Sequence, residues 1–291
     1  MWIEIEHRTS SRYDRPVFLE PLDVRLRPRA NANQVLALFA LEIAPRPVGL
    51  DEHDDLFGNG VARAWFDGVH ESLTITTRAA VETLRIDPFA GLVDPAARRL
   101  PFVPPPNIGP TLAAFSARDP ADPAVTELAM GWAREVSGET VSFLSVAARR
   151  LHEQWRPLVR PEGEPRPPSV TLVAREGSCR DLAVLYLDLC RAVGLAARFV
   201  SGYHATSPAG EGNTLHAWCE VYLPGAGWLG FDPSEGLAVG DRHVAVAVGP
   251  CSRDAAPTVG TFRGTGAKST LEAEIRLQVR AERPAGGATG S

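Results

Sequence analysis

The sequence lacks the features of several classes of protein. Its 291 residues contain no apolar run near the roughly 20 residues that a membrane-spanning helix needs, and the opening MWIEIEHRTS alternates in polarity where a signal peptide would be apolar. Basic residues are not in excess, because 30 Lys and Arg stand against 35 Asp and Glu and the net charge is −5. Such a chain has little electrostatic attraction for a phosphate backbone or an anionic lipid surface. We therefore expect a cytoplasmic protein with neither nucleic acid nor a membrane as a partner.

Cysteine is also scarce. The four cysteines lie at positions 179, 190, 219 and 251, so no two form the C-x-x-C pair of a zinc knuckle or a dithiol redox site. No acidic loop shows the alternating oxygen ligands of a calcium site. We therefore expect no metal and no cofactor. In a reducing cytoplasm each cysteine is then either a small buried apolar residue or a reactive thiol.

The rest of the composition is that of an ordinary globular protein, with 44% hydrophobic and 22% charged residues. Short segments of period two between Trp2 and Ile86, separated by turn residues, predict an antiparallel β-sandwich. A proline-rich stretch follows. Beyond it, helical periodicity is followed by strand-like segments at 197–203, 215–223, 228–232 and 244–248. We therefore predict an α+β fold, in which a β-sandwich domain precedes helices packed on an antiparallel sheet.

These patterns predict five parts of the chain. Residues 271–280 alternate strictly between apolar and polar, which indicates a last strand that is half exposed to water. The parts are a β-sandwich-like N-terminal domain (residues 1–90), a Pro-rich linker (91–123), a core of helices and sheet (124–265), a C-terminal strand (266–281) and a disordered tail (282–291).

The segment Gly177-Ser178-Cys179-Arg180-Asp181 carries the clearest chemical signal. Ser178 is a good N-cap residue, and Asp181 three positions later completes the pattern of a capping box. Cys179 is thus expected in the first turn of a helix, where unpaired N–H groups and the helix dipole stabilise a thiolate. The alternative is a core thiol beside a helix start, but the glycine and the charged neighbours favour an accessible site.

A thiolate nucleophile needs a general base and a group that orients this base. His216 begins a predicted strand at residues 215–223, and Asp232 ends the next strand. If Leu223 pairs with Gly227, the loop has three residues, and His216 lies opposite Ser234 and diagonal to Asp232. The two side chains then share a face of the hairpin. Cys219 points to the other face, so we interpret it, like Cys190, as a packing residue.

Three segments of the second half resemble a known family: GSCRDLAVLYLDLCRAVGLAARFVSGY, HAWCEVYLPGAGWLGFDPSEG and DRHVAVAVG. They are similar to the bacterial transglutaminase-like superfamily, whose core shares the papain-like cysteine-protease architecture and uses a Cys-His-Asp triad. Upstream, HRTSSRYDRPV, VRLRPR and DLFGNGV resemble the β-rich N-terminal domain of many bacterial members. The resemblance implies that Cys179 is the nucleophile, His216 the base and then acid, and Asp232 the orienting carboxylate.

Other residues receive more modest interpretations. Trp155 and Trp218 are candidates for the oxyanion site or the substrate pocket, and Ser178 and Asp181 for support of the helix cap. His243 is interpreted as a packing residue at the end of a strand. His7 and Tyr13 belong to the N-terminal motif, where a role in folding is favoured over chemistry.

The first hypothesis for function is an enzyme that transfers acyl groups from amide or peptide bonds through a cysteine thioester. Hydrolysis of a peptide or protein amide, as in a protease or amidase, is favoured over protein-glutamine crosslinking or amine transfer. The alternative of another class is a binding or assembly module that has lost catalysis. The sequence sets no oligomeric state.

Overall fold

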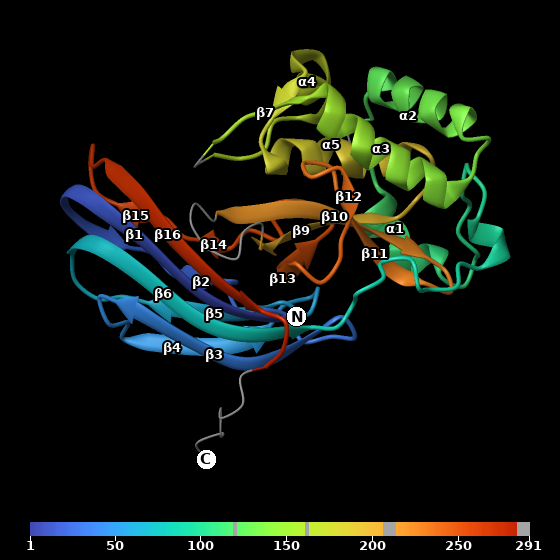
Figure 1. Cartoon of the computed structure of the whole chain (residues 1–291). Helices are drawn as coiled ribbons and strands as arrows, with labels where there is room; N and C mark the ends of the chain where they lie inside the picture. The colour runs from blue at the N-terminus through green and yellow to red at the C-terminus, as the bar shows by residue number, and fades with distance from the viewer. Residues whose placement is uncertain (119–120, 161–162, 206–213, 284–291) are drawn as a thin grey trace.

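The computed structural model describes residues 1–118, 121–160, 163–205 and 214–283 (Figure 1). Antiparallel sheets and helices occur in one chain, as predicted. Within these ranges no helix is long and apolar enough to cross a membrane. The predicted tail falls largely on residues 284–291, which lie outside the described residues.

The N-terminal half forms two antiparallel sheets. The first contains β15 (Phe262–Arg263), β1 (Trp2–Leu19), β6 (His70–Thr83), β3 (Gln34–Ala44) and β16 (Ser269–Arg280). The second has the order β14 (Thr258–Val259), β2 (Leu22–Val24), β5 (Gly60–Trp65) and β4 (Gly49–Asp54). Buried side chains of both sheets, among them Val17, Val24 and Ala64, form one apolar cluster.

The first strand is longer than the short segments that the sequence predicts between Trp2 and Ile86. Strand β1 is continuous over 18 residues, and its register with β6 shifts between Arg12 and Val17. The extra residues are absorbed by an irregularity of the ladder, which tolerates Pro16 without ending the strand.

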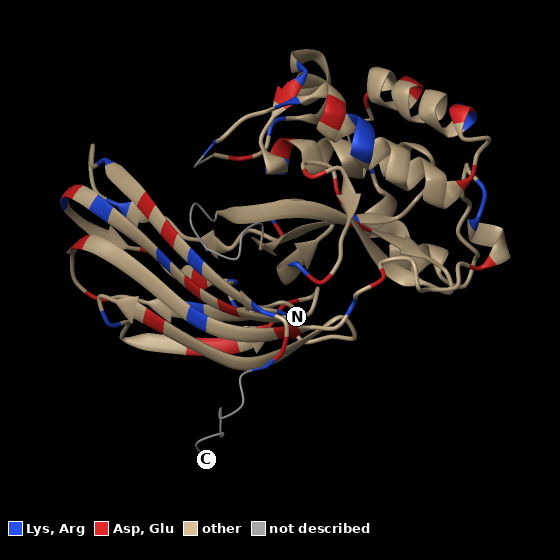
Figure 2. Ribbon diagram, in the orientation of Figure 1, with Lys and Arg blue, Asp and Glu red and all other residues tan. Residues whose placement is uncertain are grey.

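Charges of both signs lie along β1, β6 and β16 (Figure 2). Arg78 lies 3.4 Å from both Glu6 and Glu42 on the neighbouring strands. Opposite charges at cross-strand positions favour the observed pairing and keep this face in contact with water.

The second half is built on one sheet, here named the core sheet. Its order is β12 (Leu237–Ala238), β11 (Gly227–Asp232), β10 (Leu215–Leu223), β9 (Ala197–His204) and β13 (His243–Gly249). Helices α2 (Pro123–Glu135), α3 (Thr140–Gln154) and α5 (Cys179–Ala192) lie on one side of it (Figure 1). The apolar stripe of α5, including Leu185 and Leu189, packs in the same cluster as Val221 and Leu223 of β10.

The proline-rich stretch is more ordered than a linker. It contains the short 3₁₀ helix Pro95–Ala97 and helix α1 (Gly109–Ser116). Ala97 and Phe102 are buried in the apolar cluster that the helices form with the core sheet. Helix α4 (Pro168–Ala174) and the parallel pair β7 (Arg156–Pro157) and β8 (Glu176–Gly177) complete the second half. Residues 258–263, placed in the core from the sequence, return to pair with β1 and β2.

The other face of the core sheet is covered by the N-terminal half. Ile3, Val81 and Leu277 pack against Tyr203 and Val244 in one buried cluster. At the same boundary, Nδ1 of buried His7 is 2.9 Å from the Tyr203 hydroxyl. The strict alternation read in residues 271–280 is confirmed by β16, whose Ile275 and Leu277 are buried here.

Strand β13 is the outer strand of the core sheet. Two side-chain amides of the N-terminal half form hydrogen bonds with backbone groups on its free edge. The Gln34 side chain donates to the Ala245 carbonyl and accepts from the Ala245 N–H, both at 2.9 Å. The Asn59 side chain does the same for Val248, at 2.7 and 2.8 Å. Both side-chain amides are buried, so without them water could not reach the backbone N–H and carbonyl groups at this edge to form hydrogen bonds in their place.

This edge generates a stability prediction. Asn59→Ala removes both partners of the buried Val248 N–H and carbonyl, and we expect it to lower the free energy of unfolding by about 2–4 kcal/mol. The matched control is Asn107→Ala at an exposed position, with an expected change within about 0.5 kcal/mol. Urea denaturation followed by circular dichroism measures both, and equal stability of the two variants would contradict this account of the edge.

Candidate active site

Cys179 is the first residue of helix α5, as predicted, with Ser178 as its N-cap. Its side chain is partly exposed, whereas Cys190 and Cys219 are fully buried. The first N–H groups of a helix have no partner within the helix, so they and the dipole stabilise negative charge at this position.

The Asp181 carboxylate organises the turn around Cys179. It accepts from the backbone N–H of Ser178 at 2.8 Å and from the Ser178 hydroxyl at 2.9 Å. It also binds the Arg160 guanidinium at 2.8 and 3.0 Å and accepts from the Arg166 N–H at 2.7 Å. Burial opposes its charge, but these hydrogen bonds outweigh burial and lower the pKa of Asp181 below its ordinary value. The residue thus supports the helix start and also holds the preceding loop against it.

The hairpin of β10 and β11 has the predicted register. Leu223 pairs with Gly227, and Cys219 pairs with Phe231. In the turn, Gly225 has φ +85°, and a Cβ there would lie 2.4 Å from the Leu92 carbonyl oxygen. Glycine is therefore required where the segment after β6 crosses the hairpin, and this three-residue turn fixes which residues share a face.

The register brings His216 and Asp232 together. Nε2 of His216 lies 2.6 Å from Oδ2 of Asp232 and 3.4 Å from the Ser234 hydroxyl. The side chain of Cys179 is close enough to His216 to contribute to the raised pKa of the imidazole. Because Asp232 occupies Nε2, Nδ1 is the nitrogen left for the sulfur. The structure thus brings the three predicted residues together, from α5, β10 and β11.

Asp232 carries its charge in full burial. Its Oδ1 accepts from the Ser234 hydroxyl at 2.7 Å and from the backbone N–H groups of Ser234 and Glu235 at 3.0 and 3.2 Å. Burial would raise the pKa of Asp232, but the hydrogen bonds of His216 and His243 outweigh it and hold this pKa far below its ordinary value. Asp232 is therefore a carboxylate that can only accept.

The charge of Asp232 acts on His216. Burial favours neutral imidazole, but the hydrogen bonds to Asp232 and Cys179 outweigh burial and raise the pKa of His216 from 6.5 to about 10. At neutral pH His216 is an imidazolium beside the sulfur of Cys179. A cation in this place stabilises a thiolate.

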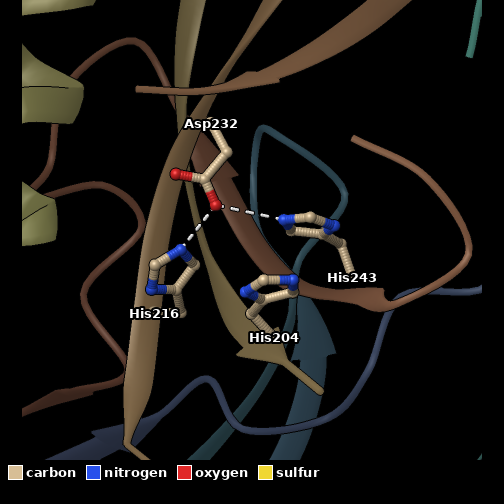
Figure 3. A group of neighbouring side chains, drawn as sticks. All are labelled: His204, His216, Asp232 and His243. Carbon is tan, nitrogen blue, oxygen red and sulfur yellow. Dashed lines mark hydrogen bonds and ion pairs between the residues drawn. The ribbon is translucent and has the colours of Figure 1, made fainter. Parts of the chain in front are cut away.

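Two further histidines, which sequence analysis did not assign to the site, lie beside this pair (Figure 3). Nε2 of His243 is 3.1 Å from Oδ2 of Asp232, and the His204 ring stacks on His243 with centroids 4.1 Å apart. Burial and the neighbouring histidines lower the pKa of His204 from 6.5 to about 3, so its ring is neutral. The interpretation of His243 as mere packing at a strand end is incomplete, because it contacts the carboxylate.

Four side chains that could ligate a metal ion lie together here: His204, His216, Asp232 and His243. One ligand atom from each lies within 4.8 Å of the others. Tetrahedral zinc, with bonds of about 2.0–2.1 Å, places ligand atoms about 3.3 Å apart. The 2.6 Å contact of His216 with Asp232 is too short for this arrangement. The rings of His204 and His243 are nearly parallel, at 14°, so their in-plane lone pairs do not converge on one ion. The geometry fits a hydrogen-bonded cluster better than a metal centre.

The two tryptophans predicted from the sequence as oxyanion or pocket residues are both buried. Trp155 is buried, and its Nε1–H donates to the Thr171 carbonyl at 2.9 Å, so the structure does not support an oxyanion contact by this group. Trp218 is also buried and packs edge-on against His243, with centroids 5.2 Å apart. Its position next to the histidine cluster indicates packing of that cluster instead of a wall of the substrate pocket.

The other cysteines lie in environments that suppress reactivity. Burial raises the pKa of Cys190 and of Cys219 above the ordinary value, and the Cys219 thiol donates to the Ala183 carbonyl. Their interpretation as packing residues agrees with this burial. Cys251 is exposed, but partial burial and its hydrogen bond to Asp254 raise the pKa of its thiol.

Comparison with known proteins places this site in a family. Residues 3–82 match the bacterial transglutaminase-like N-terminal region, and residues 132–233 match the transglutaminase-like superfamily, a range that contains Cys179, His216 and Asp232. An uncharacterized protein of Mycobacterium tuberculosis is 28% identical over 284 residues, which cover 93% of this chain and 90% of that protein. One from Mycobacterium leprae is 26% identical over 273 residues, with coverage of 92% and 95%.

A solved structure shows the same fold. It is a candidate cysteine protease from Cytophaga hutchinsonii, which aligns with a TM-score of 0.70 and 21% identity over 98% of this chain and 93% of its own. The fold, the arrangement of the site and both family matches agree with the resemblance found in the sequence. The chain belongs to the transglutaminase-like superfamily, with the bacterial transglutaminase-like N-terminal region preceding its core.

Proposed function

We propose that this protein is a cysteine enzyme that cleaves amide or peptide bonds through a thioester on Cys179, with water as the acyl acceptor. The observation that carries the proposal is that Nε2 of His216 lies 2.6 Å from the Asp232 carboxylate, while the same ring also interacts with the side chain of Cys179, which helps to raise its pKa. A nucleophile, a base and an orienting carboxylate in this order are the parts that covalent acyl transfer requires. The protease description of the Cytophaga hutchinsonii structure is consistent with this chemistry.

The first half of the reaction forms the acyl-enzyme. The thiolate of Cys179 attacks the carbonyl carbon of the amide, and the resulting oxyanion is stabilised by the N–H groups at the start of α5. The C–N bond then breaks as the His216 imidazolium gives its proton to the departing amine. The products are a thioester on Cys179, a free amine and a neutral His216.

The second half resolves the thioester. Neutral His216 takes a proton from water, whose oxygen attacks the thioester carbon. The C–S bond breaks, a carboxylic acid leaves, and the thiolate–imidazolium pair is restored. Asp232 holds the ring so that Nδ1 faces the sulfur throughout both halves, and its charge favours the imidazolium. Water is favoured over an amine because Cys179 is partly exposed and water is the most concentrated acceptor.

The nucleophile is tested by alkylation and turnover. We expect Cys179→Ala to abolish both amide cleavage and the rapid labelling by iodoacetamide at pH 7, because it removes the thiol beside the His216 imidazolium. Cys251→Ala, an exposed cysteine outside the site, and Cys219→Ala should retain both activities. Peptide mapping by mass spectrometry locates the label. Equal labelling rates at Cys179 and Cys251 would reject the activated thiol and favour a binding module.

The role of Asp232 predicts a pH dependence. His216 acts as the acid only while protonated, so the alkaline limb of kcat/KM should lie near the raised pKa of about 10. Asp232→Asn keeps the shape but removes the charge, so this limb should move toward the ordinary pKa of about 6.5 and the maximal rate should fall at least about tenfold. The measurement is kcat/KM from pH 5 to 10.5. An unshifted alkaline limb in a folded Asp232→Asn variant would show that Asp232 does not act on His216.

The acyl acceptor is tested with a library of glutamine-containing peptides, incubated with and without a primary amine. Hydrolysis of a peptide bond gives two fragments whose masses sum to that of the substrate plus about 18 Da, and hydrolysis of a glutamine side chain releases ammonia and raises the peptide mass by about 1 Da. Amine transfer to a glutamine also releases ammonia and adds the mass of the amine less about 17 Da. We expect carboxylic acid products in both incubations. Predominant amine adducts would overturn the preference for hydrolysis and support a transglutaminase that modifies or crosslinks glutamine.

A further inference from the structure

Asp232 is shared between two histidines. Its Oδ2 faces Nε2 of His216 at 2.6 Å and Nε2 of His243 at 3.1 Å (Figure 3). Its Oδ1 is held by the residues of the turn after β11, Ser234 and Glu235. The carboxylate is therefore fixed on one oxygen by its own turn and on the other by a residue from β13, a strand that is not a neighbour of β11 in the core sheet.

We propose that His243 is a positioning residue for the reaction proposed above: its Nε2–H holds Oδ2 of Asp232 where that oxygen also accepts from His216. The catalytic benefit of this positioning rests on the proposed function. The contact between His243 and Asp232 does not, and it is tested separately below.

The proton arrangement follows from the partners of the ring. Asp232 is a carboxylate and can only accept, so the proton of the contact belongs to Nε2 of His243. Nδ1 of His243 is buried without a hydrogen-bond partner among the described residues. The contact of this ring with Asp232 is therefore a hydrogen bond that Nε2–H donates and Oδ2 accepts.

The His243 ring is held on two sides. His204 stacks on it at 14°, and Trp218 meets it edge-on at 73°. The groups that face the ring are thus the Asp232 carboxylate, the neutral His204, the indole of Trp218 and, with centroids 6.3 Å apart, the ring of His216. Since His243 and Trp218 are buried, the ring cannot turn away from Asp232 without displacing packed neighbours. A donor that is fixed in this way restricts rotation of the carboxylate, which is what positioning requires.

His243→Phe and His243→Gln separate the donor from the packing. Phenylalanine keeps a ring between His204 and Trp218 but has no N–H, whereas glutamine restores an N–H at a similar reach without a ring. The matched control is His7→Phe, which removes a buried histidine and its hydrogen bond to Tyr203 at the boundary with the N-terminal half, away from Asp232. All variants carry Cys251→Ala, so that no exposed second thiol is labelled.

The primary measurement is the rate constant for alkylation of Cys179 by iodoacetamide at pH 6.5, with the melting temperature of each variant as a check of folding. We expect His243→Phe to slow alkylation about tenfold, because a freely rotating carboxylate holds the His216 imidazolium less well. His243→Gln should recover the rate to within about threefold. His7→Phe should melt at a lower temperature and react at the rate of the parent.

A second measurement observes the contact without any reaction. The proton between His216 and Asp232 should give a low-field ¹H NMR signal in the parent and in His243→Gln, and this signal should shift or broaden in His243→Phe. Unchanged alkylation and an unchanged signal in a folded His243→Phe variant would overturn the proposal. So would a glutamine variant as slow as the phenylalanine variant at equal stability.

The two proposals fail differently. If the protein cleaves no amide but the alkylation rates and NMR signals follow the expected order, the proposed function fails and the positioning role stands. If the protein cleaves amides and His243→Phe leaves kcat unchanged, the positioning role fails and the function stands. With an active substrate, the loss in His243→Phe should appear in kcat while KM stays within about twofold, since His243 is buried and acts through Asp232.

Discussion

Burial of the Asp232 charge is the constraint on which the site depends. Removing a carboxylate from water costs several kcal/mol unless donors replace the lost hydration. Here donors reach both oxygens, from His216, His243 and the turn at Ser234. Each donor comes from a different part of the chain, so the β10–β11 register, the turn after β11 and the start of β13 must all be correct at once. The carboxylate thus makes a small displacement of any of these elements costly.

A second buried carboxylate has the same role on the other side of Cys179. Asp181 satisfies its charge with Ser178, Arg160 and the Arg166 backbone, and so fixes the start of α5 and the loop before it. Asp181 determines where the sulfur lies, and Asp232 determines where the imidazole lies. The relative position of the two reacting groups is set by charges that cannot move without losing their partners.

The parts of this arrangement that were predicted from sequence are those encoded locally. The cap pattern of Ser178 and Asp181 predicted the helix start, and the three-residue turn at Gly225 predicted that His216 and Asp232 share a face. His204 and His243 had no such signal, because they reach Asp232 only through the sheet order β11-β10-β9-β13. A strand order depends on contacts that are distant in sequence. Helices α1 and α4 were missed because both are short and begin beside proline, which resembles a loop in composition.

The strand order of the core sheet also explains why the N-terminal half helps to hold the candidate active site in place. β13 is the outer strand of the core sheet, and its register with β9 shifts between Ala245 and Ala247, which leaves backbone groups for other partners. Gln34 and Asn59 supply these partners from the N-terminal half. His243 is the first residue of this strand. Its position relative to Asp232 therefore depends on how well the Gln34 and Asn59 side chains hold the strand in place. The motif DLFGNGV, which contains Asn59, therefore has a physical role far from the sulfur: it anchors the strand that carries the second histidine of the carboxylate.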